Sequence, residues 1–133
     1  MNILISLIVI IGTMVAALHV RSTLRRIKRK HAIEYYLGWG GYWHPIGLQN
    51  RITKEEADAY AARGAVYLIG YYDANGRLMR VVKYLRGAVF FEYLYTYHPN
   101  GKLQSARVMR GGRDTLLEYD KRGRRVSDAR TAL

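Results

Sequence analysis

The pattern of apolar and polar positions divides the chain into parts with different periods. Residues 3–18 contain no charged side chain, and a dense basic stretch follows at 21–30. From residue 65 onward, apolar and polar residues alternate in runs of strand length that are broken by regularly spaced glycines. An aromatic stretch and a short helical pattern lie between these parts. We therefore expect five segments, with bounds 1–33, 34–52, 53–64, 65–127 and 128–133, the last being a polar tail.

The apolar run at 2–20 predicts a single transmembrane helix, because its length is near the lower end of what crosses a bilayer. It is apolar all round, unlike a core helix, which has one apolar stripe. Positive charge follows the run rather than preceding it, which disfavours a cleaved signal peptide. The same charge predicts a single-pass membrane protein with its N-terminus outside and its C-terminal domain in the cytoplasm.

Two sets of contacts are predicted for this segment. Gly12 and Ala16 form a small-xxx-small pair that allows another helix to approach closely in the membrane. The basic side chains beside the run are expected to contact anionic lipid headgroups. These side chains are Arg21, Arg25, Arg26, Lys28, Arg29 and Lys30.

The stretch 34–47 (EYYLGWGGYWHPIG) holds both tryptophans and follows neither a helical nor a strand period. One interpretation is a loop packed over the end of a sheet as part of the core. The other is a docking surface for a membrane partner or for headgroups, since Trp and Tyr favour such contacts. The candidate docking residues are Tyr36, Trp39, Tyr42, Trp43 and His44. No second ligand stands at metal-binding spacing from His44, so a structural role is expected for it.

A short helix over 54–63 is predicted next, because Thr53 and Glu56 form a capping box and Gly64 suits the position past its end. After it, turn glycines recur at spacings of 11, 14, 11 and 11 residues, which indicates consecutive antiparallel hairpins. Strands are expected at 65–72, 77–86, 88–98, 102–110, 114–119 and, weakly, 124–127. The predicted fold class is therefore α+β: a single transmembrane helix, a short helix and a mainly antiparallel β-meander of about five or six strands.

Three segments of this β region align with one another: YDANGRL at 72–78, YHPNGKL at 97–103 and YDKRGRR at 119–125. Each reads Tyr, then Asp or His, two variable residues, Gly and a basic residue. The motif resembles the YD repeats of bacterial Rhs-type proteins and the related MORN-like tyrosine and glycine hairpin repeats. The resemblance implies stacked hairpins over 72–125 and implies no chemistry. Independently, Asp and Asn accept turn hydrogen bonds, and glycine allows positive φ.

Composition limits the chemistry that the 133-residue chain could carry. Cysteine is absent, which excludes disulfides, thiolate metal sites and a cysteine nucleophile. The sequence contains no phosphate-binding loop, no dinucleotide-binding glycine motif and no H-E-x-x-H zinc motif. We therefore expect no enzymatic activity, no cofactor, no metal and no small-molecule substrate.

The net charge of +12 and the predicted span favour an accessory subunit of a larger, bacterial-type membrane protein complex. Its β domain would cover the cytoplasmic face of integral membrane subunits and help to assemble or stabilise them. The alternative is a membrane-tethered adaptor whose basic sheet face recruits an acidic soluble partner or nucleic acid. Nucleic acid is the less favoured partner, because most tyrosines are expected to be used in packing. The candidate basic residues are Arg80, Lys83, Arg107, Arg110 and Arg113.

Overall fold

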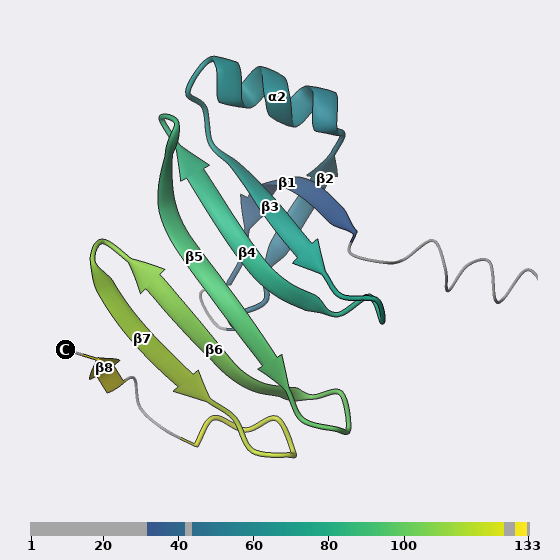
Figure 1. The fold of residues 1–133 in the computed structure, drawn as a ribbon, viewed down its shortest axis with the longest axis vertical. Helices are drawn as coiled ribbons and strands as arrows, with labels where there is room; N and C mark the ends of the chain where they lie inside the picture. Colours follow the sequence, from purple (N-terminus) through teal and green to yellow (C-terminus); the bar gives the residue numbers. More distant parts are fainter. Residues whose placement is uncertain (1–31, 42–43, 127–129, 133) are drawn as a thin grey trace, which may run out of the picture.

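The computed structural model describes residues 32–41, 44–126 and 130–132, which form one antiparallel sheet and one short helix (Figure 1). The strand order is β2-β1-β3-β4-β5-β6-β7-β8, so from β3 onward each strand lies beside its successor. The elements are β1 (Ile33–Trp39), β2 (Leu48–Ile52), α2 (Lys54–Ala62), β3 (Tyr67–Tyr72), β4 (Leu78–Leu85), β5 (Ala88–Tyr97), β6 (Leu103–Arg110), β7 (Arg113–Glu118) and β8 (Arg130–Ala132).

The predicted fold class is wrong. The described residues form eight strands rather than five or six, since β1 and β2 occupy part of the stretch expected to be irregular. In the described part of the chain, no helix is long and apolar enough to cross a membrane. The predicted single-pass localisation, with the N-terminus outside, is contradicted by that finding and is not carried further. The predicted span, with Gly12, Ala16 and the six basic residues at 21–30, lies outside the described residues.

Strand β1 escaped prediction because it is a central strand with apolar side chains on both faces. It pairs with β2 along one edge and with β3 along the other, which uses its backbone groups on both sides. Gly38 lies inside it because β2 approaches closely there: a Cβ on Gly38 would stand 3.0 Å from the Cβ of Gln49. Glycine in a strand often marks such a close approach rather than a turn.

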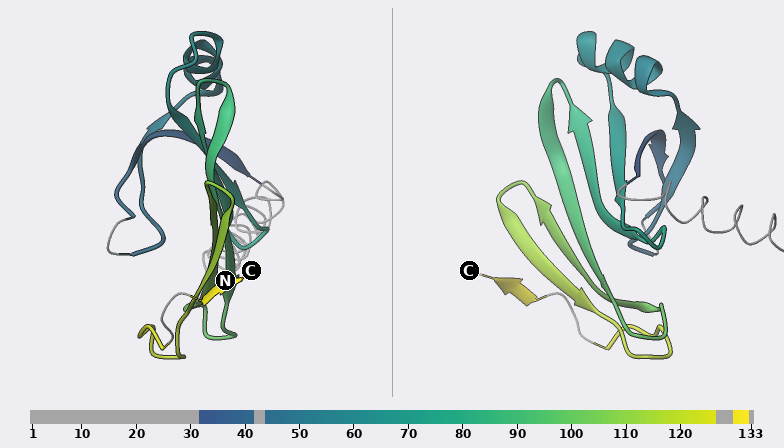
Figure 2. Two further views of the ribbon diagram at one scale, coloured as in Figure 1. Left: turned by 90° about the vertical axis from the view of Figure 1, so that its left-hand side faces the viewer. Right: turned by 45° about the vertical axis from the view of Figure 1, so that its right-hand side comes forward.

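The β1–β2 hairpin leaves the plane of the sheet and curves over one face, which we call the covered face (Figure 2). The side chains of Leu68, Val81, Phe91, Tyr95 and Ala106 on this face are all buried and form most of the core. Burial of such side chains supplies the main stabilising free energy of the domain. The opposite face is called the open face.

Helix α2 begins at the predicted capping box. The Thr53 hydroxyl accepts a hydrogen bond from the Glu56 amide (3.2 Å), and the Glu56 carboxylate accepts one from the Thr53 amide (2.7 Å). The helix packs against β1 and β3 through Ala57, which is 1% exposed. Gly64, with φ of +68°, reverses the chain after it. The helix predicted over 54–63 is thus confirmed.

The three aligned segments form turns with one hydrogen-bond pattern. In each, the amide of the first turn residue (Asp73, His98 or Asp120) donates a hydrogen bond to the carbonyl four residues later. The carbonyl of the same residue accepts one from the glycine amide three residues later. The glycines have φ between +78° and +85°. The repeat tyrosines pack against the core. The predicted hairpin turns are confirmed, and β3 to β7 match the predicted strands within two residues.

Candidate anion-binding groove

The predicted docking residues that the structure describes lie against the covered face. Tyr36 is 8% exposed, and its hydroxyl donates to the Glu34 carboxylate (2.6 Å) and lies 2.7 Å from the Tyr72 hydroxyl. The Trp39 ring packs on Phe91 and Tyr93, with centroid distances of 5.2 and 5.0 Å. Both side chains are therefore used inside the domain. Tyr42 and Trp43 lie outside the described residues.

The loop that carries His44 is held down by the sheet beneath it. The Tyr95 hydroxyl donates to the Pro45 carbonyl, and the His44 Nδ1 accepts from the Ile46 amide (3.3 Å). The His44 ring lies 6.4 Å from the ring of Tyr119. A docking role for the stretch 34–47 stays a prediction.

The five basic residues predicted to form one sheet face are divided by the structure. Arg80 pairs with Glu92, and Arg107 pairs with Asp114 through contacts of 2.8 and 2.9 Å from its Nε. The hydrogen bonds from Arg107 lower the pKa of the Asp114 carboxyl. These two arginines lie on the open face, where their charges are largely neutralised by their partners.

The other three basic residues gather where β5 begins and the β6–β7 turn closes. A register shift on β4 after Lys83 makes Phe90 an extra residue of β5, so that it lies on the same side as Phe91. The Lys83 ammonium lies 5.1 Å from the centroid of the Phe90 ring. The Arg110 guanidinium lies 4.7 Å from the same centroid. Two cations thus converge on one aromatic ring, a geometry that an aromatic face favours.

Arg113 stands directly opposite Arg110 across the two-residue turn made by Gly111 and Gly112. These glycines have φ of +57° and +75°, which the tight hairpin turn requires. Like charges placed directly opposite on neighbouring strands destabilise a sheet. Within the described part of the chain, no carboxylate forms an ion pair with Lys83, Arg110 or Arg113.

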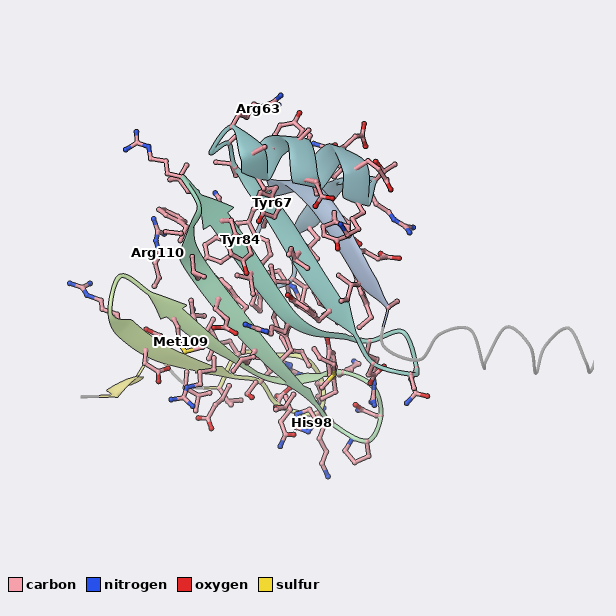
Figure 3. All side chains as sticks on the ribbon, turned by 45° about the horizontal axis from the view of Figure 1, so that its top comes forward. Arg63, Tyr67, Tyr84, His98, Met109 and Arg110 are labelled. Carbon is pink, nitrogen blue, oxygen red and sulfur yellow. The ribbon has the colours of Figure 1, made fainter. Side chains whose placement is uncertain are left out.

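An open groove of about 370 Å³ lies beside Phe90, Arg110 and Arg113, and Lys83 is not part of its lining. That volume is at the lower end for sites that bind small ligands or short segments. Figure 3 shows Met109 and Arg110 on the same part of the sheet, with Arg63 at the same end and His98 at the other. The lining consists of Val89, Phe90, Met109, Arg110, Gly111, Gly112, Arg113 and Asp114.

The groove has the chemistry of an anion site. Its one acidic lining residue, Asp114, is already engaged by Arg107, so the cations around Phe90 keep their positive potential. Arg110 also acts on Tyr93: burial raises the pKa of that tyrosine, and the guanidinium opposes the rise. A carboxylate or phosphate placed between Arg110 and Arg113 would be stabilised by charge-assisted hydrogen bonds.

Sequence reasoning identified the three cations but not the residues that bring them together. The regular strand predicted over 88–98 would direct Phe90 away from Phe91. The signal in the sequence is the adjacent pair of phenylalanines, which breaks the alternation of β5. Among the described residues, no group of three or more His, Asp or Glu side chains could hold a metal ion.

Comparison with known proteins gives one family. The model of a family of unknown function (DUF6156) matches residues 28–128. No curated protein and no solved structure matches the chain significantly. The matching family is described as neither a YD nor a MORN repeat family, so the resemblance of the three turns to those repeats stays a prediction.

Proposed function

The chain belongs to the DUF6156 family of unknown function. We propose, from its own residues, that it is a non-catalytic binding module that holds an acidic segment of a partner protein. The binding site is the groove between the start of β5 and the β6–β7 turn. The observation that carries the proposal is the meeting of Lys83 and Arg110 on one ring, with Arg113 opposite Arg110. Among the described residues, no carboxylate forms an ion pair with any of the three. The proposal requires no membrane span.

Electrostatics supports a partner that supplies the missing negative charge. An exposed ion pair contributes about 0.2–1 kcal/mol, and a charged pair that becomes desolvated at an interface contributes more. Arginines beside aromatic rings are common at the centres of protein interfaces. Carboxylates from a partner would relieve the repulsion between Arg110 and Arg113 and gain contacts with both.

A protein segment fits the charge distribution better than a nucleic acid does. Nucleic-acid sites track several phosphates along a continuous basic stripe. On this sheet the stripe is interrupted, because Arg80 and Arg107 are paired with Glu92 and Asp114 on the open face. Arg110 and Arg113 both line one short groove, which suits a few carboxylates.

The test compares two double variants of the full-length protein that remove the same charge. Arg110→Gln with Arg113→Gln changes the groove, whereas Lys121→Gln with Arg122→Gln changes the exposed turn at the other end of the sheet. Binding of a fluorescent glutamate-rich peptide is measured by anisotropy at two salt concentrations, and circular dichroism checks folding.

We expect the groove variant to lose about tenfold or more in affinity, which corresponds to roughly 1.4 kcal/mol. The turn variant should keep its affinity within about twofold, as expected for a distant rim charge. Equal losses in both variants, or no binding by the unmodified protein, would refute the proposal. Tighter binding of an oligothymidylate than of the peptide at the same salt would replace the protein partner by a nucleic acid.

A further inference from the structure

Strand β5 extends beyond its neighbour β6 at the end where the groove lies. It pairs with β4 from Ala88 onward, but its first partner on β6 is Met109, which pairs with Glu92. In the described part of the structure, residues 88–91 therefore make no backbone pairing on this side, and β6 ends one residue past Met109, at Arg110. Figure 1 shows the same offset, with the β4–β5 turn rising well above the β6–β7 turn.

This free edge carries no charged residue and no proline, and the bulge at Phe90 is its one irregular position. Unpaired strand edges bind other strands unless a charge, a proline or a covering element prevents it. Residues 88–91 read Ala-Val-Phe-Phe, and Val89 is 56% exposed. The groove opens along this edge, since Val89 and Phe90 line one side of it and Arg110 to Asp114 line the other.

The dimensions of the edge suit a short extended segment. Four residues of strand span about 13 Å at a rise of roughly 3.3 Å per residue. A segment lying there would continue the line of β6 beyond its turn. Its side chains would alternate between the two faces of the sheet, and those on the covered side would point toward Lys83 and Arg110 around Phe90.

We propose that the acidic segment adds to the sheet as a β-strand along residues 88–91 of β5. This inference rests on the proposed function and specifies how the partner is held. Backbone hydrogen bonds to the edge of β5 supply sequence-independent affinity, and the cations select carboxylates at every second position. The favoured partner is thus an extended segment in which acidic and apolar residues alternate.

The test uses the full-length protein and a short peptide of alternating Glu and Val. Two modified versions carry N-methyl groups, one on every valine nitrogen and the other on every glutamate nitrogen. In an antiparallel pair, only alternate residues direct their N–H groups toward a given neighbour. Strand addition therefore requires that one modified peptide loses about tenfold or more in affinity while the other binds nearly as the parent does.

Each other outcome has a distinct meaning. If both modified peptides bind as the parent does, strand addition is wrong, and the electrostatic function stands. If both lose affinity equally, strand addition is also wrong, because edge pairing uses only one set of amides. If the parent peptide does not bind at all, the proposed function fails and this inference fails with it. A peptide of alternating Lys and Val should not bind and serves as the charge control.

Discussion

The Tyr95 hydroxyl is the most deeply buried polar group that links the β1–β2 loop to the sheet. Tyr95 is 2% exposed, and its hydroxyl donates to the carbonyl of Pro45, 50 residues earlier in the chain. Burial raises the pKa of this tyrosine, so it stays protonated and able to donate. Replacing it with Phe keeps the ring in the core and removes only the donor.

The expected magnitude follows from the acceptor that is left behind. A buried carbonyl without a partner costs about 1–3 kcal/mol, and the variant no longer has to bury a hydroxyl, so we expect a net loss of about 1–2 kcal/mol. For a domain of this size, each 1 kcal/mol lowers Tm by roughly 4–8 °C. The loss should be concentrated in the loop, because the sheet beneath it keeps its backbone ladder.

Thermal unfolding measures the total loss, and hydrogen exchange of the Gly40 amide locates it. That amide donates to the Gly47 carbonyl (2.7 Å) across the base of the loop. Tyr97→Phe is the matched control, since its hydroxyl donates to Leu78 on the neighbouring strand β4 (2.5 Å). Exchange at Gly40 should accelerate in Tyr95→Phe and stay unchanged in Tyr97→Phe. Unchanged exchange in Tyr95→Phe would show that the hydroxyl does not hold the loop, and the reasoning would be refuted.

Three further predictions concern stability. Burial raises the pKa of Tyr97 from 10.0 to about 12, so its contribution to stability is complete below pH 10 and is lost as the pH rises toward 12. Tyr97→Phe should therefore flatten the dependence of stability on pH over that range. An unaltered dependence in alkaline unfolding experiments would contradict this. Gly47→Ala should destabilise the protein far more than Gly87→Ala. A Cβ on Gly47 would lie 2.3 Å from the Gly41 amide nitrogen, whereas a Cβ on Gly87 meets open space and only the φ of +73° is strained. Denaturant midpoints measure the difference, and equal shifts in the two variants would count against the close approach. Thr53→Ala should lower the free energy of unfolding by about 1 kcal/mol, because it removes the helix cap. Chemical denaturation measures this, and no measurable change would show that the capping box is dispensable.

The meander from β3 to β7 was predictable because its signals are local. Turn residues such as Asp73, Asn100 and Asp120 accept backbone hydrogen bonds within a few residues of their own positions. The glycine of each turn takes a positive φ that other residues rarely adopt. Since neither feature depends on distant parts of the chain, spacing in the sequence was enough to place the hairpins.

The first hairpin and the groove were not predictable in this way. Strand β1 becomes a strand because β2 and β3 pair with both of its edges, and its aromatic residues are buried because the hairpin folds over the covered face. The cations Lys83, Arg110 and Arg113 stand out in the sequence as separate charges. Nothing in their spacing shows that Arg80 and Arg107 form ion pairs, whereas these three form none with the described residues.

The turns between β3 and β7 and the start of α2 follow from the local sequence, because they depend on contacts a few residues apart. Which strands are neighbours, which charges are paired, and which edge of β5 has no neighbouring strand among the described residues depend on contacts between distant parts of the chain. The register shift that turns Phe90 toward Phe91 depends on pairing with β4, a contact between strands that no local pattern encodes. The candidate function of this protein rests on that second kind of information.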